Sequence, residues 1–253
     1  MKPRFTDQVV IVTGGSRGIG FALSKALARE GARVVLAAVN EDRGQEAAQW
    51  IRNEGGQAEF IRTDVTQHKQ VETLVTKTIG QFGAIHALVN NAGAHDSAPF
   101  WEESEDLWDR MYRVNVMGTV LPSQMVVRRF FDQGGGGAIV NVASKAGVVG
   151  EPGHVAYSAA KGAVLTITRA MAVELAPYSI RVNAVCPGPV LTDMLVENVP
   201  TEEGRQKLAD EAPLGRIGLP DDIVGAVLLL ASSEADWCTG QAISIDGGMS
   251  ILK

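Results

Sequence analysis

Residues 9–20 have the sequence VVIVTGGSRGIG, in which a run of β-branched residues leads directly into a glycine-rich turn. Such a run is typical of a buried strand, and glycines let a tight turn bring its backbone close to a ligand. The apolar residues that follow have helical spacing, at Ile19, Ala22, Leu23, Ala26 and Leu27. A helix N-terminus offers unpaired N–H groups to a phosphate. The stretch therefore predicts either a strand–turn–helix unit that binds the pyrophosphate of a dinucleotide or a sharp turn that binds nothing.

The alternation of short apolar runs with helical stretches continues along the whole chain. The predicted strands are residues 9–12, 33–38, 58–62, 84–90, 138–143, 180–186 and 242–245. They are mostly apolar throughout, as expected for strands covered on both faces. This pattern predicts an α/β fold with a doubly wound (Rossmann), mostly parallel seven-stranded sheet and helices on both faces. We expect residues 1–253 to form a single dinucleotide-binding and catalytic domain, in which the polar segment at about 191–213 is either a substrate lid or a surface helix.

The composition limits the partners that the protein can have. Hydrophobic residues make up 45% of the 253 residues and charged residues 21%, with a net charge of −6 and no basic run, which argues against a nucleic-acid partner. Cys186 and Cys238 lie far apart and are predicted to be free thiols. The N-terminal apolar run is too short for a signal segment or a membrane span. We therefore expect a cytoplasmic protein without a membrane partner, and the histidine spacing predicts no metal site.

Tyr157 and Lys161 are four residues apart in a helical stretch, which places them on one helix face. A phenol with a pKa of about 10 is a poor acid–base group at neutral pH, but a neighbouring ammonium lowers that pKa, so the pair suits proton transfer to a carbonyl or from an alcohol. Ser144, just after the fifth predicted strand, binds the substrate oxygen or caps a turn. Asn115, in a predicted helix, is either a surface residue or holds a water against the backbone. Asp64 either accepts a hydrogen bond from adenine or caps a helix.

Together these residues resemble the short-chain dehydrogenase/reductase family over essentially the full length of the chain. The matching motifs are Thr-Gly-x-x-x-Gly-x-Gly at 13–20, Asp64, Asn-Asn-Ala-Gly at 90–93, Asn115, Ser144, Tyr-x-x-x-Lys at 157–161 and Pro-Gly at 187–188. The resemblance implies an NAD(P)(H)-dependent oxidoreductase that transfers hydride between a nicotinamide and a secondary alcohol or ketone, such as a sugar, a polyol or a small carbonyl compound. It also implies a homotetramer.

The resemblance assigns a role to each catalytic residue. Tyr157 would be the general acid/base, and Ser144 would orient and polarise the substrate oxygen. Lys161 would bind the nicotinamide ribose and lower the Tyr157 pKa, and Asn115 would hold a water in a proton relay. The implied cofactor contacts are Gly14, Ser16, Arg17, Gly18, Ile19, Gly20, Ala38, Val39, Asn40, Asp64, Val65, Asn90, Asn91, Ala92, Gly93, Tyr157, Lys161, Pro187, Gly188, Val190 and Thr192.

The end of the second predicted strand bears on the choice of cofactor. NAD-preferring relatives usually carry Asp there, where it bonds the ribose 2′-OH, and NADP-preferring relatives often carry Arg at the next position. Here these positions are Ala38 and Val39, so neither signature is complete. Arg17 is placed to contact a 2′-phosphate, with help from Arg43, although a solvated turn residue is the alternative for Arg17. We therefore expect NADP(H) to be favoured and NAD(H) to be possible.

The substrate pocket implied by the resemblance is unusually polar. Its predicted members are His95, Asp96, Ala146, Glu151, His154 and Met194. A polar rim favours a hydroxylated substrate, unless these side chains face water outside the pocket.

Two other functions are kept open. A 3-oxoacyl-[acyl-carrier-protein] reductase would need basic residues before the fifth and sixth strands, where glycines 134–137 and Tyr178 stand instead. A dinucleotide-binding sensor or scaffold usually lacks part of the Ser–Tyr–Lys set, which is complete here.

Overall fold

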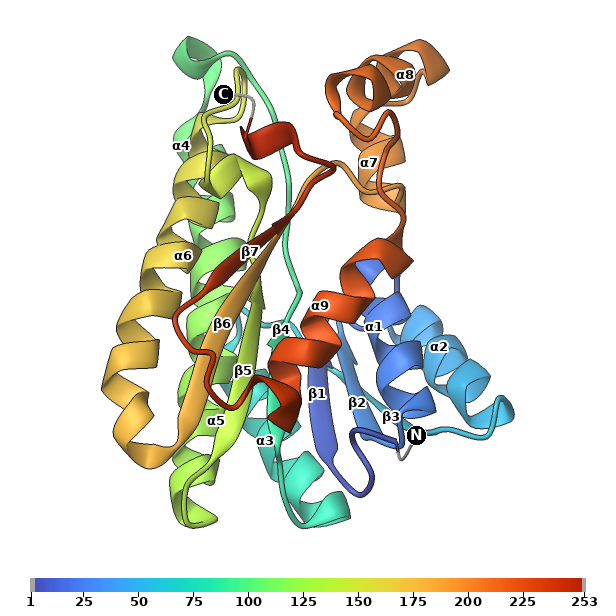
Figure 1. Cartoon of the computed structure of the whole chain (residues 1–253), viewed down its shortest axis with the longest axis vertical. Helices are drawn as coiled ribbons and strands as arrows, with labels where there is room; N and C mark the ends of the chain where they lie inside the picture. Colours follow the sequence, from blue (N-terminus) through green and yellow to red (C-terminus); the bar gives the residue numbers. More distant parts are fainter. Residues whose placement is uncertain (1–2, 252–253) are drawn as a thin grey trace.

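The computed structural model describes residues 3–251, whose strands form one parallel sheet in the order β3-β2-β1-β4-β5-β6-β7 (Figure 1). The strands are β1 (Val9–Thr13), β2 (Arg33–Ala38), β3 (Gln57–Arg62), β4 (Ala87–Asn90), β5 (Gly137–Val142), β6 (Ile180–Pro187) and β7 (Ala242–Ile245). The predicted doubly wound α/β fold is confirmed, with every strand pair parallel.

The predicted strands are found close to their expected bounds. The largest difference is at β4, which begins at Ala87 and not at residue 84. The preceding helix ends only at Phe82, and Gly83 then turns the chain with a φ of 81°. Residues 83–86 are needed for this turn into the sheet, and their apolar character made them resemble part of the strand.

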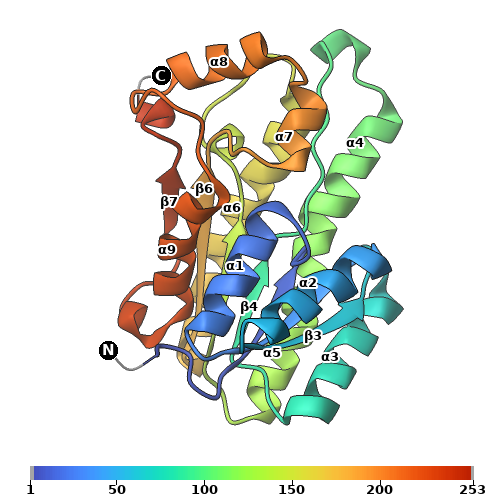
Figure 2. The same cartoon turned by 90° about the vertical axis from the view of Figure 1, so that its right-hand side faces the viewer.

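Helices cover both faces of the sheet (Figure 2). The helices are α1 (Gly18–Arg29), α2 (Glu41–Asn53), α3 (His68–Phe82), α4 (Glu105–Met111), α5 (Gly118–Asp132), α6 (Val155–Leu175), α7 (Asp193–Asn198), α8 (Glu202–Glu211) and α9 (Pro220–Ala231). Helices α1, α2 and α9 share one apolar core with the sheet, and α3, α5 and α6 share the other. Within residues 3–251, no helix is both long enough and apolar enough to cross a membrane.

The segment predicted at about 191–213 forms two short helices, α7 and α8, which stand above the carboxyl end of the sheet (Figure 1). The Thr192 hydroxyl accepts a hydrogen bond from Leu195 N at 3.4 Å and caps α7. The Thr201 hydroxyl caps α8 by accepting one from Gly204 N at 3.2 Å. The alternative of a single surface helix is therefore replaced by a pair of separately capped helices.

A chain of buried hydrogen bonds ties α5 and α6 to the middle of the sheet. The Asn90 amide nitrogen donates to Asn141 Oδ1 and to Ser123 Oγ, both at 2.9 Å. The Asn141 amide nitrogen donates in turn to Thr168 Oγ1 on α6 at 2.9 Å. All four residues are buried, so each depends on its neighbours for partners.

We expect Asn141→Leu to lower the free energy of unfolding by about 2–4 kcal/mol, because Asn90 and Thr168 each lose a buried partner. Urea unfolding followed by circular dichroism measures the change. Thr166→Val is the control, because Thr166 lies on the exposed side of α6, the helix that carries Thr168. This substitution should change the free energy of unfolding by less than about 0.5 kcal/mol. Equal effects of the two substitutions would contradict a structural role for this chain of bonds.

Candidate active site

The turn between β1 and α1 is shaped so that only glycine fits at its closest points. Gly14 and Gly18 have positive φ angles of 62° and 52°. A Cβ on Gly20 would lie 2.1 Å from the Gly14 carbonyl oxygen. Helix α1 begins at Gly18, and its N-cap, Arg17, gives no side-chain capping bond. The turn therefore presents the first backbone N–H groups of α1 and leaves room for an anion such as a pyrophosphate.

The segment after β4 holds this turn in place. Thr13 Oγ1 accepts hydrogen bonds from Asn91 N and Ala92 N, both at 3.0 Å. The Asn91 amide nitrogen donates back to the carbonyl oxygens of Thr13 at 3.0 Å and Gly14 at 3.2 Å. The predicted Asn-Asn-Ala-Gly motif thus fixes the position of the glycine turn relative to the rest of the carboxyl edge.

Asn115 is buried and forms two bonds to one backbone unit. Its amide nitrogen donates to Ala94 O at 2.9 Å and its Oδ1 accepts from Ala94 N at 3.2 Å. It lies in a π-helical turn, Tyr112–Met117, between α4 and α5. A Cβ on Gly93 would lie 3.0 Å from Asn115 Oδ1 and 3.4 Å from Lys161 Nζ. Gly93 therefore lies close to both the Asn115 amide and the Lys161 ammonium, and a side chain at this position would crowd both groups.

Tyr157 and Lys161 project from the first half of α6, and Ser144 follows β5. Lys161 Nζ donates to Val142 O at 3.0 Å and lies 5.9 Å from the centre of the Tyr157 ring. Gly147 lets the segment after Ser144 approach α6, because a Cβ there would lie 2.7 Å from the Lys161 backbone. The four predicted catalytic residues are thus gathered at the carboxyl edge of β4 and β5, where open α/β sheets bind ligands.

Burial opposes the charged form of both Tyr157 and Lys161. It raises the pKa of the Tyr157 phenol to about 12, and the nearby Ser144 hydroxyl lowers it only in part. Burial lowers the pKa of Lys161 to about 8. The protein's own groups therefore keep the phenol protonated at neutral pH, and the lowering expected from Lys161 is outweighed by desolvation.

Ser144 and Asp64 also have local roles. Ser144 Oγ accepts a hydrogen bond from Ala146 N at 3.1 Å and begins a short 3₁₀ turn. Asp64 Oδ1 accepts from the backbone N and the hydroxyl of Thr66, at 2.9 and 2.8 Å. It does not cap α3, whose N-cap is Gln67. Val65, beside Asp64, is buried against Gly118.

The segment after β6 closes another side of the site. Gly188 packs against Asp246, where a Cβ would meet the Asp246 Cα at 2.8 Å. Val190 is buried and pairs with Gly218. Thr192 reaches the glycine turn, since its Cγ2 would lie 3.1 Å from a Cβ on Gly18.

The residues predicted to choose the cofactor lie around the end of β2. Ala38 is the last residue of β2, Val39 is exposed, and Asn40 caps α2 by accepting a bond from Arg43 N at 2.9 Å. Arg62, which the motifs do not identify, donates to Val39 O at 3.2 Å. The register of the sheet brings Arg62 to the end of β2, because Arg62 of β3 pairs with Ala38 of β2.

Of the two histidines in the predicted substrate pocket, His95 contacts Tyr157 and His154 contacts His95. The His95 ring contacts the Tyr157 ring edge to face, and the centres of these two rings are 4.7 Å apart. The centres of the His95 and His154 rings are 4.9 Å apart. His154 Nδ1 lies 2.8 Å from Pro152 O, so it donates to this carbonyl. Burial lowers the pKa of His95, which keeps its ring neutral. The two imidazoles give this wall of the site groups that can donate or accept hydrogen bonds.

The other predicted pocket residues are engaged elsewhere. Asp96 pairs with Arg110 of α4 at 3.0 Å. Glu151 pairs with Lys145, a buried residue next to Ser144 that the motifs do not identify. Ala146 is also buried. Met194 lies in α7, where its carbonyl oxygen accepts a bond from the Asn198 amide at 2.7 Å.

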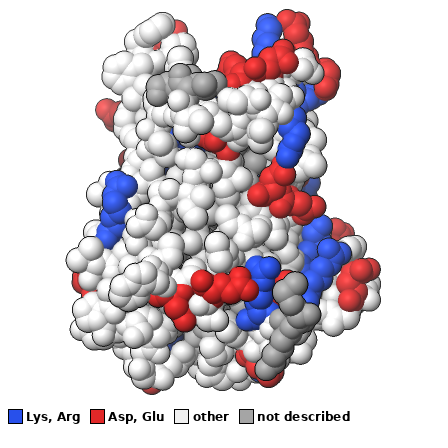
Figure 3. Space-filling view, in the orientation of Figure 1, with Lys and Arg blue, Asp and Glu red and all other residues white. Residues whose placement is uncertain are grey.

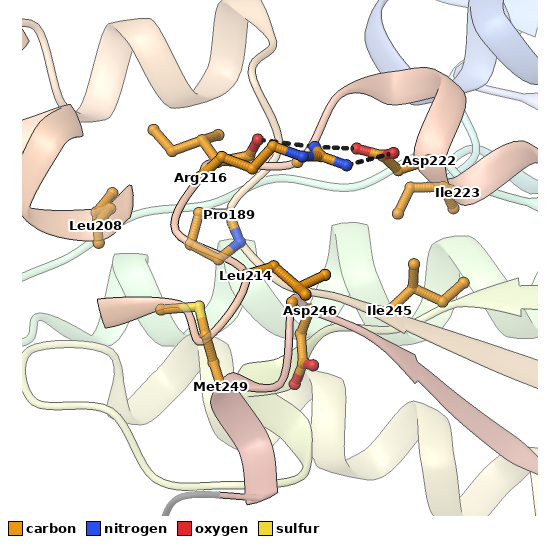
Figure 4. A pocket seen from close by; sticks show the side chains of 12 residues that line it. Pro189, Leu208, Leu214, Arg216, Asp222, Ile223, Ile245, Asp246 and Met249 are labelled. Carbon is orange, nitrogen blue, oxygen red and sulfur yellow. Dashed lines mark hydrogen bonds and ion pairs between the residues drawn. The ribbon is translucent and has the colours of Figure 1, made fainter. Parts of the chain in front are cut away.

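A separate pocket lies between the segment after β6, helix α8 and the residues that follow β7 (Figure 4). Arg216 and Asp222 form a two-bond ion pair at its edge, at 2.6 and 2.9 Å. The lining residues are Pro189, Leu208, Leu214, Arg216, Ile217, Gly218, Asp222, Ile223, Ile245, Asp246, Gly247 and Met249. No predicted catalytic residue is among them. In the described part of the chain, no group of three or more His, Cys, Asp or Glu residues is placed to hold a metal ion.

Comparison with known proteins places the chain among oxidoreductases. A family model described as enoyl-(acyl carrier protein) reductase matches residues 14–250. A cyclopentanol dehydrogenase of Comamonas testosteroni is 40% identical over 97% of this chain and 98% of its own length. An L-rhamnose 1-dehydrogenase (NAD(P)(+)) of Azotobacter vinelandii is 37% identical over 97% of each chain. The solved structure of a short-chain type dehydrogenase/reductase from Mycobacterium marinum is 37% identical, with a TM-score of 0.93 over 98% of this chain and 97% of the other.

We expect Lys161 to make stability depend on pH. Because burial lowers its pKa from the usual 10.5 to about 8, the unfolded chain binds more protons at this group than the folded protein between these values. The contribution of Lys161 to stability therefore rises with pH above pH 8. In urea unfolding at pH 7 and pH 9, the wild type should gain about 1 kcal/mol relative to Lys161→Met. A difference that does not grow between the two pH values contradicts the lowered pKa.

Proposed function

The chain belongs to the short-chain dehydrogenase/reductase family, and from that premise we propose that it transfers hydride between a nicotinamide cofactor and a secondary alcohol or ketone. The observation that carries the proposal is the gathering of Ser144, Tyr157, Lys161 and Asn115 at the carboxyl edge of the sheet, beside the glycine turn. The bound cofactor supplies or accepts the hydride, and the protein supplies position and proton transfer.

Tyr157 is the general acid in the direction of reduction. Its raised pKa keeps the phenol protonated, so it gives a proton to the substrate oxygen as negative charge develops there. The Ser144 hydroxyl orients the same oxygen. Lys161 binds the nicotinamide ribose. Its ammonium and the buried Asn115 amide lie on either side of Gly93, which suits a relay that returns a proton to the site.

The cofactor fits the β1–α1 turn, and NADP(H) is the preferred form, with NAD(H) also possible. The glycine turn has the shape and the free N–H groups that a pyrophosphate needs. Ala38 provides no carboxylate to repel a 2′-phosphate. Arg17 and Arg43 are near enough to each other that both ion-pair with Asp193, so they form one cationic site for that phosphate.

The substrate is a sugar, a polyol or a small carbonyl compound. The neutral imidazole of His95 and the neighbouring His154 ring support a hydroxylated substrate, because both rings can exchange hydrogen bonds with a hydroxyl group near Tyr157. The names of the cyclopentanol and L-rhamnose dehydrogenases support the same range of alcohols.

Reduction of 3-oxoacyl groups on acyl carrier protein is the second candidate, favoured by a relative of that name in Chlamydia muridarum that is 36% identical over 99% of this chain. The residues at which an acyl carrier protein would dock argue against this candidate. An acidic carrier needs basic residues before β5 and β6, where Gly135, Gly136 and the exposed Tyr178 stand. The net charge of −6 adds long-range repulsion of an acidic partner.

The enzyme is proposed to work as a cytoplasmic homotetramer. Val173 on α6 and Trp237 just before β7 are large apolar residues that are mostly or fully exposed, and the family resemblance implies subunit contacts through the helix that carries Tyr157 and through the C-terminal strand. Exposed apolar side chains on such elements support burial against other subunits. The free thiols Cys186 and Cys238 support a reducing compartment.

We expect Tyr157→Phe to lower turnover about 10²- to 10⁴-fold, because the phenyl ring keeps the packing against His95 and loses the proton donor. Steady-state rates with NADPH and a ketone panel measure the loss. Thermal melting and cofactor binding should stay unchanged. Tyr178→Phe, at the opposite end of α6, is the matched control and should retain full activity. Retained turnover in Tyr157→Phe would overturn the assignment of this residue.

We expect the wild type to bind NADPH about tenfold more tightly than NADH, which corresponds to about 1.4 kcal/mol. Titration of both cofactors, followed by quenching of tryptophan fluorescence, gives the two dissociation constants. Arg17→Ala should remove most of the difference between the two dissociation constants, because the Arg17 guanidinium is proposed to bind the 2′-phosphate, which NADH lacks. Tighter binding of NADH by the wild type would show that a group other than a β2 carboxylate holds the ribose hydroxyls.

A further inference from the structure

Helix α7, the first helix in the segment at about 191–213, forms ion pairs with Arg17 and Arg43, which lie at the beginning of α1 and of α2 at the predicted cofactor site. Asp193, the first residue of α7, has its Oδ2 3.1 Å from Arg43 Nη1 and 3.9 Å from Arg17 Nη1. Glu197, one turn later, has its Oε1 3.8 Å from the same Arg17 nitrogen. Figure 3 shows basic and acidic side chains intermixed along the side of the molecule that carries α1, α2 and α7. Two arginines thus face two carboxylates of α7.

The two arginines come from the elements that surround the expected adenosine ribose. Arg17 is the N-cap of α1 within the glycine turn, and Arg43 lies in the first turn of α2, just after β2 ends at Ala38. Since β2 contributes no carboxylate, the acidic group that meets these arginines comes from α7. Asp193 therefore occupies the cationic site that a 2′-phosphate would use.

We propose that Asp193 limits the preference for NADP(H), by competing with the 2′-phosphate of this cofactor for Arg17 and Arg43. This inference rests on the proposed binding of the cofactor at the β1–α1 turn. A phosphate dianion accepts more hydrogen bonds and carries more charge than a carboxylate, so it displaces Asp193 from the arginines. NAD(H) carries a hydroxyl at this position and leaves the contacts of Asp193 in place.

Asp193→Asn should therefore strengthen the binding of NADPH and leave that of NADH unchanged. The side chains of Asp193, Arg17 and Arg43 are about half exposed, so water and salt weaken their ion pairs. The expected gain is correspondingly modest, about threefold to tenfold in the dissociation constant of NADPH. The gain should shrink as salt is raised towards 1 M.

The experiment measures the dissociation constants of NADPH and NADH by fluorescence quenching, without turnover. Asp221→Asn is the matched control, because Asp221 is also an exposed acid in the first turn of a helix, α9. It removes the same charge away from the arginines and should change neither constant by more than twofold. In Arg43→Gln, the effect of Asp193→Asn on NADPH should fall to less than half, because the competition has lost its closest partner.

The outcomes separate this inference from the proposed function. If the wild type binds neither cofactor, the proposed function fails and the inference with it. If both cofactors bind but Asp193→Asn leaves the NADPH constant unchanged, the inference alone is overturned. The same holds if Asp193→Asn shifts the constants for both cofactors equally, or if Asp221→Asn gives the same gain, because the effect would then be one of overall charge.

Discussion

The close approach of the β1–α1 turn to its own helix is the constraint on which the rest of the site depends. The contact between Gly20 and the Gly14 carbonyl leaves no space for a side chain, so helix α1 starts directly above the end of β1. Thr13 and Asn91 then tie this turn to the end of β4 through four hydrogen bonds. Gly93 follows in the same segment and lies close to both Asn115 and Lys161. The position of the glycine turn therefore helps to fix the positions of these two residues.

Burial away from water has the largest influence on the pKa values of Tyr157 and Lys161. A simple pairing argument takes the Lys161 ammonium as the cause of an acidic Tyr157, but burial acts on both groups against charge and moves their pKa values towards the neutral forms. A buried phenol at a pKa of about 12 holds its proton firmly until negative charge develops on the oxygen that accepts it. The protein's own groups therefore keep Tyr157 protonated, and forming its phenolate requires additional positive charge close to the ring.

The sequence was most informative where burial is uniform. Strands covered on both faces are continuous apolar runs, so all seven were found, whereas their order in the sheet is known only from the structure. The directions in which individual side chains point could not be predicted from the sequence. Nothing in the local pattern shows that Asp96 turns to Arg110, or that Glu151 closes on Lys145, because these partners meet only after α4 and α6 have packed. The π-helical turn that buries Asn115 also depends on packing and has no signature in residue spacing.

Charged groups from other parts of the chain reach the end of β2, where the cofactor motifs are incomplete. Arg62 lies beside Ala38 through strand pairing, and Asp193 reaches Arg43 from a segment 150 residues later. An acidic group on α7 instead of β2 would link cofactor choice to the position of α7. If a 2′-phosphate binds Arg17 and Arg43 as proposed, α7 loses the ion pairs of Asp193, so phosphate binding and the attachment of α7 oppose each other. Such coupling is reciprocal by thermodynamic necessity, and a carboxylate fixed on β2 would not provide it.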